Sequence, residues 1–142
     1  MTREFVPEDM LKFTCLDPHI MAEEEGIDPI VSAKWHISQG PCATIEEGGA
    51  VQACGGIWIF WPGTAQAWVR FNLPCALSTL REVTRRMLSW ADQYQLNRIQ
   101  ATTLTGWKEG EKFLASLGMK PEGIMRKYGP NGLDSTLYAW VR

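Results

Sequence analysis

The chain has 142 residues, of which 45% are hydrophobic and 21% are charged, and its formal net charge is -2. These values are typical of a soluble globular protein with a single domain spanning residues 1–142. The charge balance argues against an obligatory nucleic-acid partner, and no apolar run reaches the ~18–20 residues that a membrane span needs.

The four cysteines form no Cys-x-x-Cys pair, and the polar N-terminal segment has no secretory signature. The sequence therefore predicts free thiols in a reducing cytoplasm. The two histidines and the cysteines do not show the spacing of a common zinc site, so we expect no bound metal.

Three helical segments are predicted ahead of the first strand, over residues 7–13, 17–26 and 28–39. Each has a proline in its first turn, where the missing amide hydrogen costs least. Acidic residues 23–25 are expected to form a solvated face of the second segment.

Residues 42–57 are predicted to form a β-hairpin with its turn at 47–49, and the second strand continues to Trp61. Residues 57–61 are apolar on both faces, which predicts a strand covered by helices on both sides. A turn at 62–64 leads to a returning strand over 66–71, where Trp68 meets Trp58 if the register pairs them.

Helices and strands alternate in the rest of the chain. Residues 80–94 form the clearest amphipathic helix, with Thr79 and Glu82 as a capping-box signature at its start. A strand over 99–104, a helix over 108–117 and strands over 119–128 and 135–141 follow. This order predicts an α/β (α+β) three-layer sandwich with a central mixed, mostly antiparallel sheet and helices on both faces.

The order of elements resembles that of the GNAT N-acetyltransferase superfamily, over roughly residues 40–142. Residues 113–119, Phe-Leu-Ala-Ser-Leu-Gly-Met, are similar to that family's Phe-Tyr-x-x-x-Gly-Phe segment. A narrower resemblance is to small GNAT-like proteins of tailed phages, carried by residues 26–29, 53–56 and 67–69. It implies a role inside the virion or in its assembly.

If the protein is catalytic, the resemblance implies acetyl-CoA as its cofactor. The residues that would bind it are Trp68, Val69, Arg70, Phe71 and Arg81.

Three family features differ in this chain. The loop over residues 70–80 has no glycine, and Pro74 removes an amide N–H that a phosphate would need. Leu114 stands where the family has its general-acid tyrosine, and Trp107 stands where it has an asparagine. We therefore expect no bound cofactor and assign no catalytic residue.

The aromatic stretch over residues 54–71 is predicted to be core. Its large rings are bulky enough to fill the gap between the fourth and fifth strands that receives the cofactor arm in working enzymes. These rings are Trp58, Trp61, Trp68 and Phe71.

Three hypotheses follow for the function. The first is a non-catalytic GNAT-fold protein of phage origin that contacts protein partners such as other virion proteins, in the host cytoplasm or the virion, through Trp61, Arg85 and Arg86. The alternative is a divergent acetyl-CoA-dependent N-acetyltransferase, in which the 70–79 loop would hold an anion. The third is nucleic-acid binding through Arg81, Arg85, Arg86 and Trp90, with steep salt dependence.

Overall fold

The computed structural model describes residues 1–13, 25–72 and 74–142. Seven strands form one sheet in the order β1-β2-β3-β4-β5-β7-β6. Neighbouring strands run antiparallel except β4 and β5, which run parallel. The strands are β1 (Thr2–Glu4), β2 (Cys42–Glu47), β3 (Ala50–Trp61), β4 (Thr64–Phe71), β5 (Arg98–Leu104), β6 (Lys120–Met125) and β7 (Ser135–Val141).

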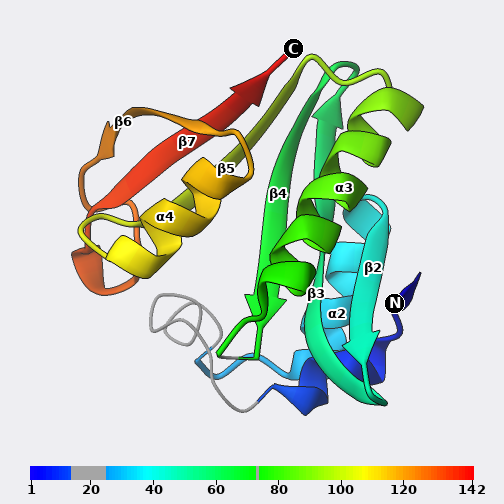
Figure 1. Ribbon diagram of the computed structural model, residues 1–142. Helices are drawn as coiled ribbons and strands as arrows, with labels where there is room; N and C mark the ends of the chain where they lie inside the picture. Colours follow the sequence, from blue (N-terminus) through cyan, green and yellow to red (C-terminus); the bar gives the residue numbers. More distant parts are fainter. Residues whose placement is uncertain (14–24, 73) are drawn as a thin grey trace.

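Helices cover both faces of this sheet (Figure 1). One face carries α3 (Leu77–Gln93) and α4 (Lys108–Ser116), and the other carries α2 (Pro29–Gln39) and the short 3-10 helix η1 (Pro7–Lys12). A second 3-10 turn, η2 (Pro130–Gly132), joins β6 to β7. No helix among the described residues is long and apolar enough to cross a bilayer.

Local sequence signals explain where several elements begin. Asp28 caps α2, because its Oδ1 accepts the amide hydrogens of Ile30 and Val31 at 2.8 and 3.2 Å. The β2–β3 turn uses Gly48 and Gly49 at φ 60° and 78°, a backbone region that favours glycine. The start of α2 and the position of this turn were both predicted from the sequence.

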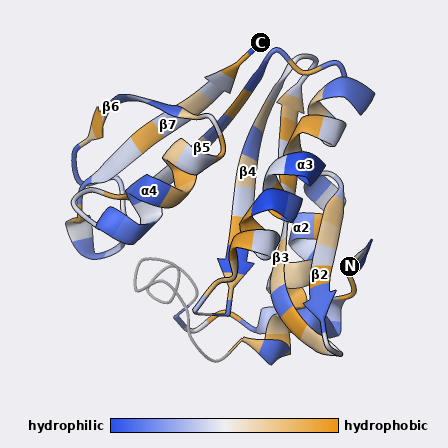
Figure 2. Cartoon of the chain, in the orientation of Figure 1, coloured by the Kyte–Doolittle hydropathy of each residue, from blue (hydrophilic) through white to orange (hydrophobic). Residues whose placement is uncertain are grey.

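Two hydrophobic clusters hold the layers together. The larger one lies between the sheet and helices α3 and α4, and it includes Ile57, Leu96 and Ile99, each at most 1% exposed. The smaller cluster lies under α2 and η1, and it includes Phe5 and Trp68. Figure 2 shows hydrophilic residues on the outward turns of α3, as expected for a helix that buries one side.

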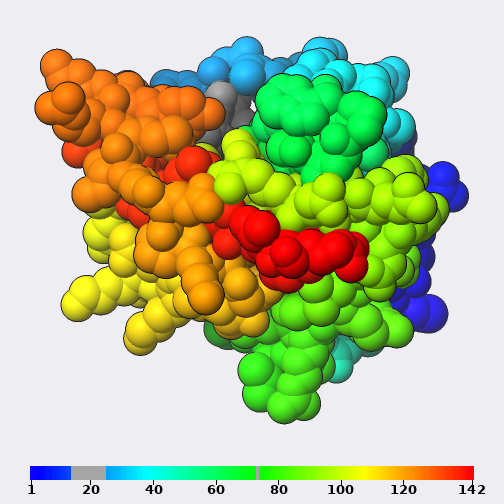
Figure 3. All heavy atoms as spheres, turned by 90° about the horizontal axis from the view of Figure 1, so that it is seen from above, coloured from blue at the N-terminus to red at the C-terminus, as the bar shows by residue number. Residues whose placement is uncertain are grey.

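The end of the chain caps α3. The Arg142 backbone amide donates to the Asn97 carbonyl at 2.9 Å, and its guanidinium donates to the carbonyls of Leu96 and Ala91. In the view from above, the C-terminal residues in red lie between the end of α3 and the orange β6 segment (Figure 3). Hydrogen bonds therefore join the residue after β7 to the C-terminal end of α3.

The predicted fold class is confirmed, and three details were wrong. Helix α3 begins at Leu77 with Ala76 as its N-cap, so Thr79 is not the cap. Strand β1 was not predicted, and the strand predicted over 119–128 ends at Met125. The helix predicted over residues 17–26 lies almost wholly outside the described residues.

Candidate functional site

Strands β4 and β5 pair only over three residues each. The pairs join Thr64–Gln66 of β4 to Arg98–Gln100 of β5, and no further pair follows. Beyond Gln66, the edge of β4 that faces β5 has no ladder partner among the described residues. The two parallel strands therefore separate into a V in the middle of the sheet, and beyond Gln66 no described strand pairs with this edge of β4.

A cavity of about 750 Å³ occupies this separation. Its lining comes from both faces of the sheet: Val83 and Met87 of α3 on one side, and Trp35 and His36 of α2 on the other. Such a volume lies in the usual range of small-molecule sites, roughly 300–1,000 Å³. The cavity thus connects the two faces through the V.

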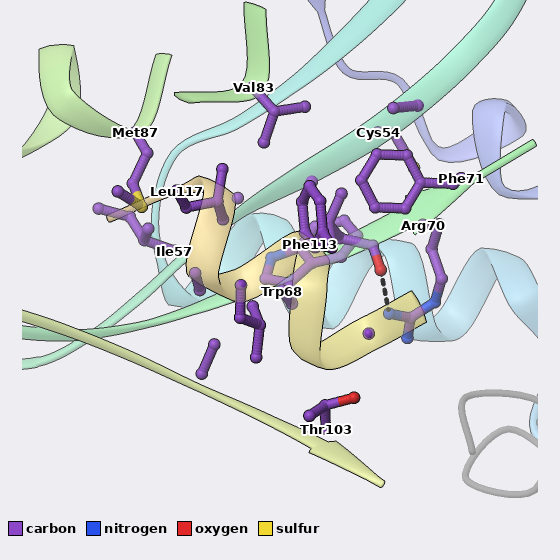
Figure 4. Close-up of a pocket in the computed structure, with 18 of the residues that line it drawn as sticks. Cys54, Ile57, Trp68, Arg70, Phe71, Val83, Met87, Thr103, Phe113 and Leu117 are labelled. Atoms are coloured by element: carbon purple, nitrogen blue, oxygen red, sulfur yellow. Dashed lines mark hydrogen bonds between the residues drawn. The ribbon is translucent and has the colours of Figure 1, made fainter. Parts of the chain in front are cut away.

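On the α3 and α4 side, the cavity is mainly apolar. Phe71 at the end of β4 meets Phe113 of α4 edge-on, with 4.6 Å between ring centroids. Figure 4 shows these two rings near Arg70 at one end of the cavity, with Ile57, Met87 and Leu117 toward the other end.

Leu114 and Thr103 both line the cavity on this side. Leu114, at the position of the general-acid tyrosine, is 5% exposed and belongs to the larger core cluster, so it presents no proton donor. Thr103 of β5 also lines the cavity, and its buried hydroxyl has no hydrogen-bond partner among the described residues. An unpartnered buried hydroxyl is costly, which suits a position that a ligand would satisfy.

On the α2 side, a histidine lies between two tryptophans. The His36 ring stacks on Trp68 with 3.9 Å between centroids and lies parallel to Trp58 within 8°. The Trp58 Nε1–H donates to His36 Nδ1 at 2.9 Å. Burial, together with the positive charge of Arg70, lowers the pKa of His36 to about 4. His36 is therefore neutral at pH 7 and carries its proton on Nε2.

Among the described residues between β4 and α3, Cys75 lines the cavity. Pro74 is exposed and does not line the cavity. Ala76, the N-cap of α3, has no side chain to cap the first amides of the helix. Glu82, expected to complete a capping box there, instead accepts hydrogen bonds from Thr2 and Arg85. The start of α3 keeps its positive end free of a capping oxygen.

Four of the five predicted cofactor-binding residues line the cavity. Trp68, Val69, Arg70 and Phe71 all line the cavity, with Trp68 toward α2 and Phe71 toward α4. Arg81 is exposed on α3 and does not line it.

The three predicted protein-contact residues do not form one surface patch around a common site: two are exposed and one lines the cavity. Trp61 is 61% exposed at the β3–β4 turn beside Phe60. Arg85 is exposed and paired with Glu82. Arg86 lines the cavity with its guanidinium 5.8 Å from the centre of the Trp90 ring.

The prediction that the aromatic stretch is core is confirmed for Trp68, which is 7% exposed in the smaller cluster, but the rings do not fill the gap between β4 and β5. Trp58 and Trp68 turn toward α2, Trp61 turns to solvent, and Phe71 contacts only one wall, so the cavity remains. Trp58 also does not face Trp68 across the ladder, because Trp68 pairs with Gly56 and Trp58 with Gln66.

His36 was not identified from the sequence as a site residue. In the sequence it is a single histidine among apolar residues of the predicted helix over 28–39. It becomes informative only once the β3–β4 register places Trp58 and Trp68 on the sheet face that α2 covers.

No protein-family model matches the chain, and no curated protein matches it. Solved structures do. The ribosomal-protein-alanine N-acetyltransferase of Brucella melitensis superposes with a TM-score of 0.78 at 14% identity, over 100% of this chain and 99% of that one. An N-acetyltransferase from Staphylococcus aureus gives 0.74 at 16% identity, over 99% and 97%.

A Salmonella typhimurium protein described as an acetyltransferase and solved with its cofactor acetyl-CoA gives 0.75 at 14% identity, over 99% of this chain and 92% of that one. The chain therefore has the GNAT fold. At this level of identity the likeness defines the fold alone.

Proposed function

We propose that the protein is an acyl-CoA-dependent N-acyltransferase that receives the acyl-bearing arm of acetyl-CoA between β4 and β5. One observation carries the proposal: the two strands separate after Gln66 and leave a cavity that reaches both faces of the sheet. The proposal reverses the expectation that no cofactor is bound, because the rings expected to block the gap leave it open.

The residues present fit such an arm. An extended chain that contains amides can pair with the free edge of β4, as a peptide does when it adds to a sheet. The walls formed by Val83, Met87 and Phe113 are apolar and suit its methylene groups. The uncapped start of α3 suits its phosphates, although Pro74 offers no amide there.

Bound in this way, acetyl-CoA supplies an activated thioester to an amine that approaches from the α2 face. The chain contributes position and exclusion of water. Leu114 donates no proton to a departing thiolate, and Tyr128 is the tyrosine among the described residues that line the cavity.

Calorimetric titration of the folded protein with acetyl-CoA tests the proposal. We expect one-to-one binding that Ala67→Trp weakens at least tenfold, because Ala67 lines the cavity and an indole there fills the V. Ala115→Trp, on the exposed side of α4, is the matched control and should leave binding unchanged. Ala67→Leu serves if the larger substitution lowers stability, and circular dichroism checks each variant. A folded wild-type protein that gives no signal in the millimolar range would overturn the proposal.

A second candidate is a non-catalytic protein of phage origin, located in the host cytoplasm or the virion, that contacts virion proteins. Two observations favour it: the buried Leu114 at the tyrosine position, and the exposed pair formed by Phe60 and Trp61. This hypothesis requires the opposite outcome of the same titration, namely no binding of acetyl-CoA by the folded protein.

A further inference from the structure

The α2 side of the cavity is built from aromatic rings. We call Trp35, His36, Trp58 and Trp68 the aromatic wall; all four line the cavity. The Trp35 ring meets Trp58 edge-on at 5.2 Å and is 50% exposed, whereas His36 and Trp68 are 4% and 7% exposed. Rings held by their neighbours in this way offer a rigid, apolar surface to a flat group.

The polar atoms of the aromatic wall are hydrogen-bond donors. Because His36 Nδ1 accepts from Trp58, the remaining nitrogen Nε2 carries a hydrogen. The Trp68 Nε1–H is shielded from solvent and has no partner among the described residues. This nitrogen lies over Gly56 of β3, so a ligand in the cavity does not contact it.

The charges around the cavity favour a ligand without extra positive charge. Arg70, buried beside the Trp68 ring at 5.6 Å, lies on the same side as the aromatic wall. Arg86 and Lys112 line the opposite side, where Glu109 is the single carboxylate among the described lining residues. A polycation bound here would meet like charges and few acceptors, whereas a carboxylate would meet donors and a guanidinium.

From these observations we infer that the acceptor of the proposed acyl transfer is an aromatic amino acid, with its ring on the aromatic wall and its carboxylate toward the Arg70 guanidinium. The inference rests on the proposed function and names the substrate class for the same cavity. In this orientation the α-amine points toward the V, where the thioester would lie.

The transfer is balanced without a further reactant. The α-amine nitrogen bonds to the thioester carbonyl carbon, the carbon–sulfur bond breaks, and the sulfur leaves as a thiolate that receives the proton lost by the amine. His36 cannot take that proton, because its Nδ1 already accepts from Trp58 and its Nε2 carries a hydrogen. The positive charge of Arg70, which disfavours a proton on His36, also disfavours the ammonium form of the amine.

Calorimetry with L-phenylalanine, L-alanine and spermidine tests the inference, both alone and with acetyl-CoA present. We expect L-phenylalanine to bind at least tenfold more tightly than L-alanine and spermidine to give no signal. Trp35→Ala should weaken L-phenylalanine binding about fivefold, since it removes the exposed ring of the aromatic wall, which meets Trp58 edge-on. Arg70→Gln removes the guanidinium that would meet the carboxylate, and should weaken it about tenfold.

Trp61→Ala is the matched control, because Trp61 is an exposed tryptophan that does not line the cavity. It should leave the affinity for L-phenylalanine unchanged. Preference for spermidine or L-alanine, or equal loss in Trp35→Ala and Trp61→Ala, would overturn the inference while binding of acetyl-CoA still supports the proposed function. If the folded wild-type protein does not bind acetyl-CoA, the proposed function is wrong, whatever its affinity for L-phenylalanine.

Discussion

The buried histidine predicts a specific dependence of stability on pH. In the unfolded chain the pKa of a histidine is about 6.5, and in the folded protein that of His36 is lowered to about 4. Between these values the unfolded state binds more protons, so the free energy of unfolding falls as the pH falls. The contribution of His36 is therefore complete above pH 6.5 and lost progressively toward pH 4.

The size of the effect follows from the two pKa values. A difference of about 2.5 units corresponds to roughly 3 kcal/mol at the acid limit, and about 2.5 kcal/mol of this is lost between pH 7.5 and pH 4.5. For a domain whose total stability is of order 5–15 kcal/mol, a loss of this size is easily measured.

Urea unfolding followed by tryptophan fluorescence at a series of pH values measures this loss. His36→Gln removes the titrating ring, so we expect a lower stability at pH 7.5 and a shallower pH dependence than in the wild-type protein. His19→Gln removes the other histidine and shows how much of the slope belongs to that residue. If the His36→Gln protein keeps the wild-type slope between pH 6.5 and 4.5, the assignment of a buried neutral His36 is wrong.

Two further predictions concern stability at neutral pH, each measured by urea unfolding. Asp9 is 0% exposed and accepts hydrogen bonds from both terminal Arg3 nitrogens, at 2.7 and 2.8 Å, and from the buried Thr44 hydroxyl. Asp9→Ala removes this acceptor, while Arg3 keeps its ion pair with Glu46, so we expect a cost of about 2–3 kcal/mol; a loss below about 1 kcal/mol would refute that role. Gly40→Ala would place a Cβ 2.1 Å from the Ile57 carbonyl oxygen, so we expect a loss above about 2 kcal/mol, whereas Gly123→Ala, in open space, should be nearly neutral. Equal losses in the two glycine variants would contradict the predicted clash.

The same buried carboxylate adds a second pH dependence at lower pH. Burial alone would raise the pKa of Asp9, but hydrogen bonds from Arg3, the Val6 amide and Thr44 outweigh it and hold that pKa well below its usual range. Its stabilising contribution is present above about pH 4 and is lost as the pH falls further. The loss due to His36 begins at a higher pH, so the two groups can be measured in separate ranges.

Most secondary-structure elements could be predicted because their signals are local. Pro29 after the capping Asp28, the Gly48–Gly49 turn and the stripe along α3 each lie within one segment. Strand β1 could not be predicted, because it has three residues and exists through its pairing with β2, more than thirty-five residues away.

The candidate site was harder to predict because it depends on register. Moving the β3–β4 pairing by one residue would put Trp58 and Trp68 on opposite faces of the sheet, so His36 could contact only one of them. Composition indicates how much aromatic surface the chain has, but only the pairing decides whether it fills the V or lines it. The incorrect expectation of a filled gap came from this step.

The gap that would receive the cofactor and the residues that would donate a proton are independent features of this chain. The V between β4 and β5 is a property of the backbone, set by where the strand pairing stops, and it persists without the family's tyrosine and asparagine. Leu114 removes a side chain of α4 that would act on the leaving group, whereas the tyrosines near the cavity lie elsewhere: Tyr138 on β7, in the same core cluster, and Tyr128 in the β6–β7 connection, where it lines the cavity. On the proposed function, acetyl-CoA can therefore bind without a proton donor at position 114. The features for binding and orientation, which in intramolecular reactions supply several kcal/mol of the barrier reduction, do not depend on that position, whereas the roughly 10²–10⁴-fold contribution of a positioned acid would have to come from another residue.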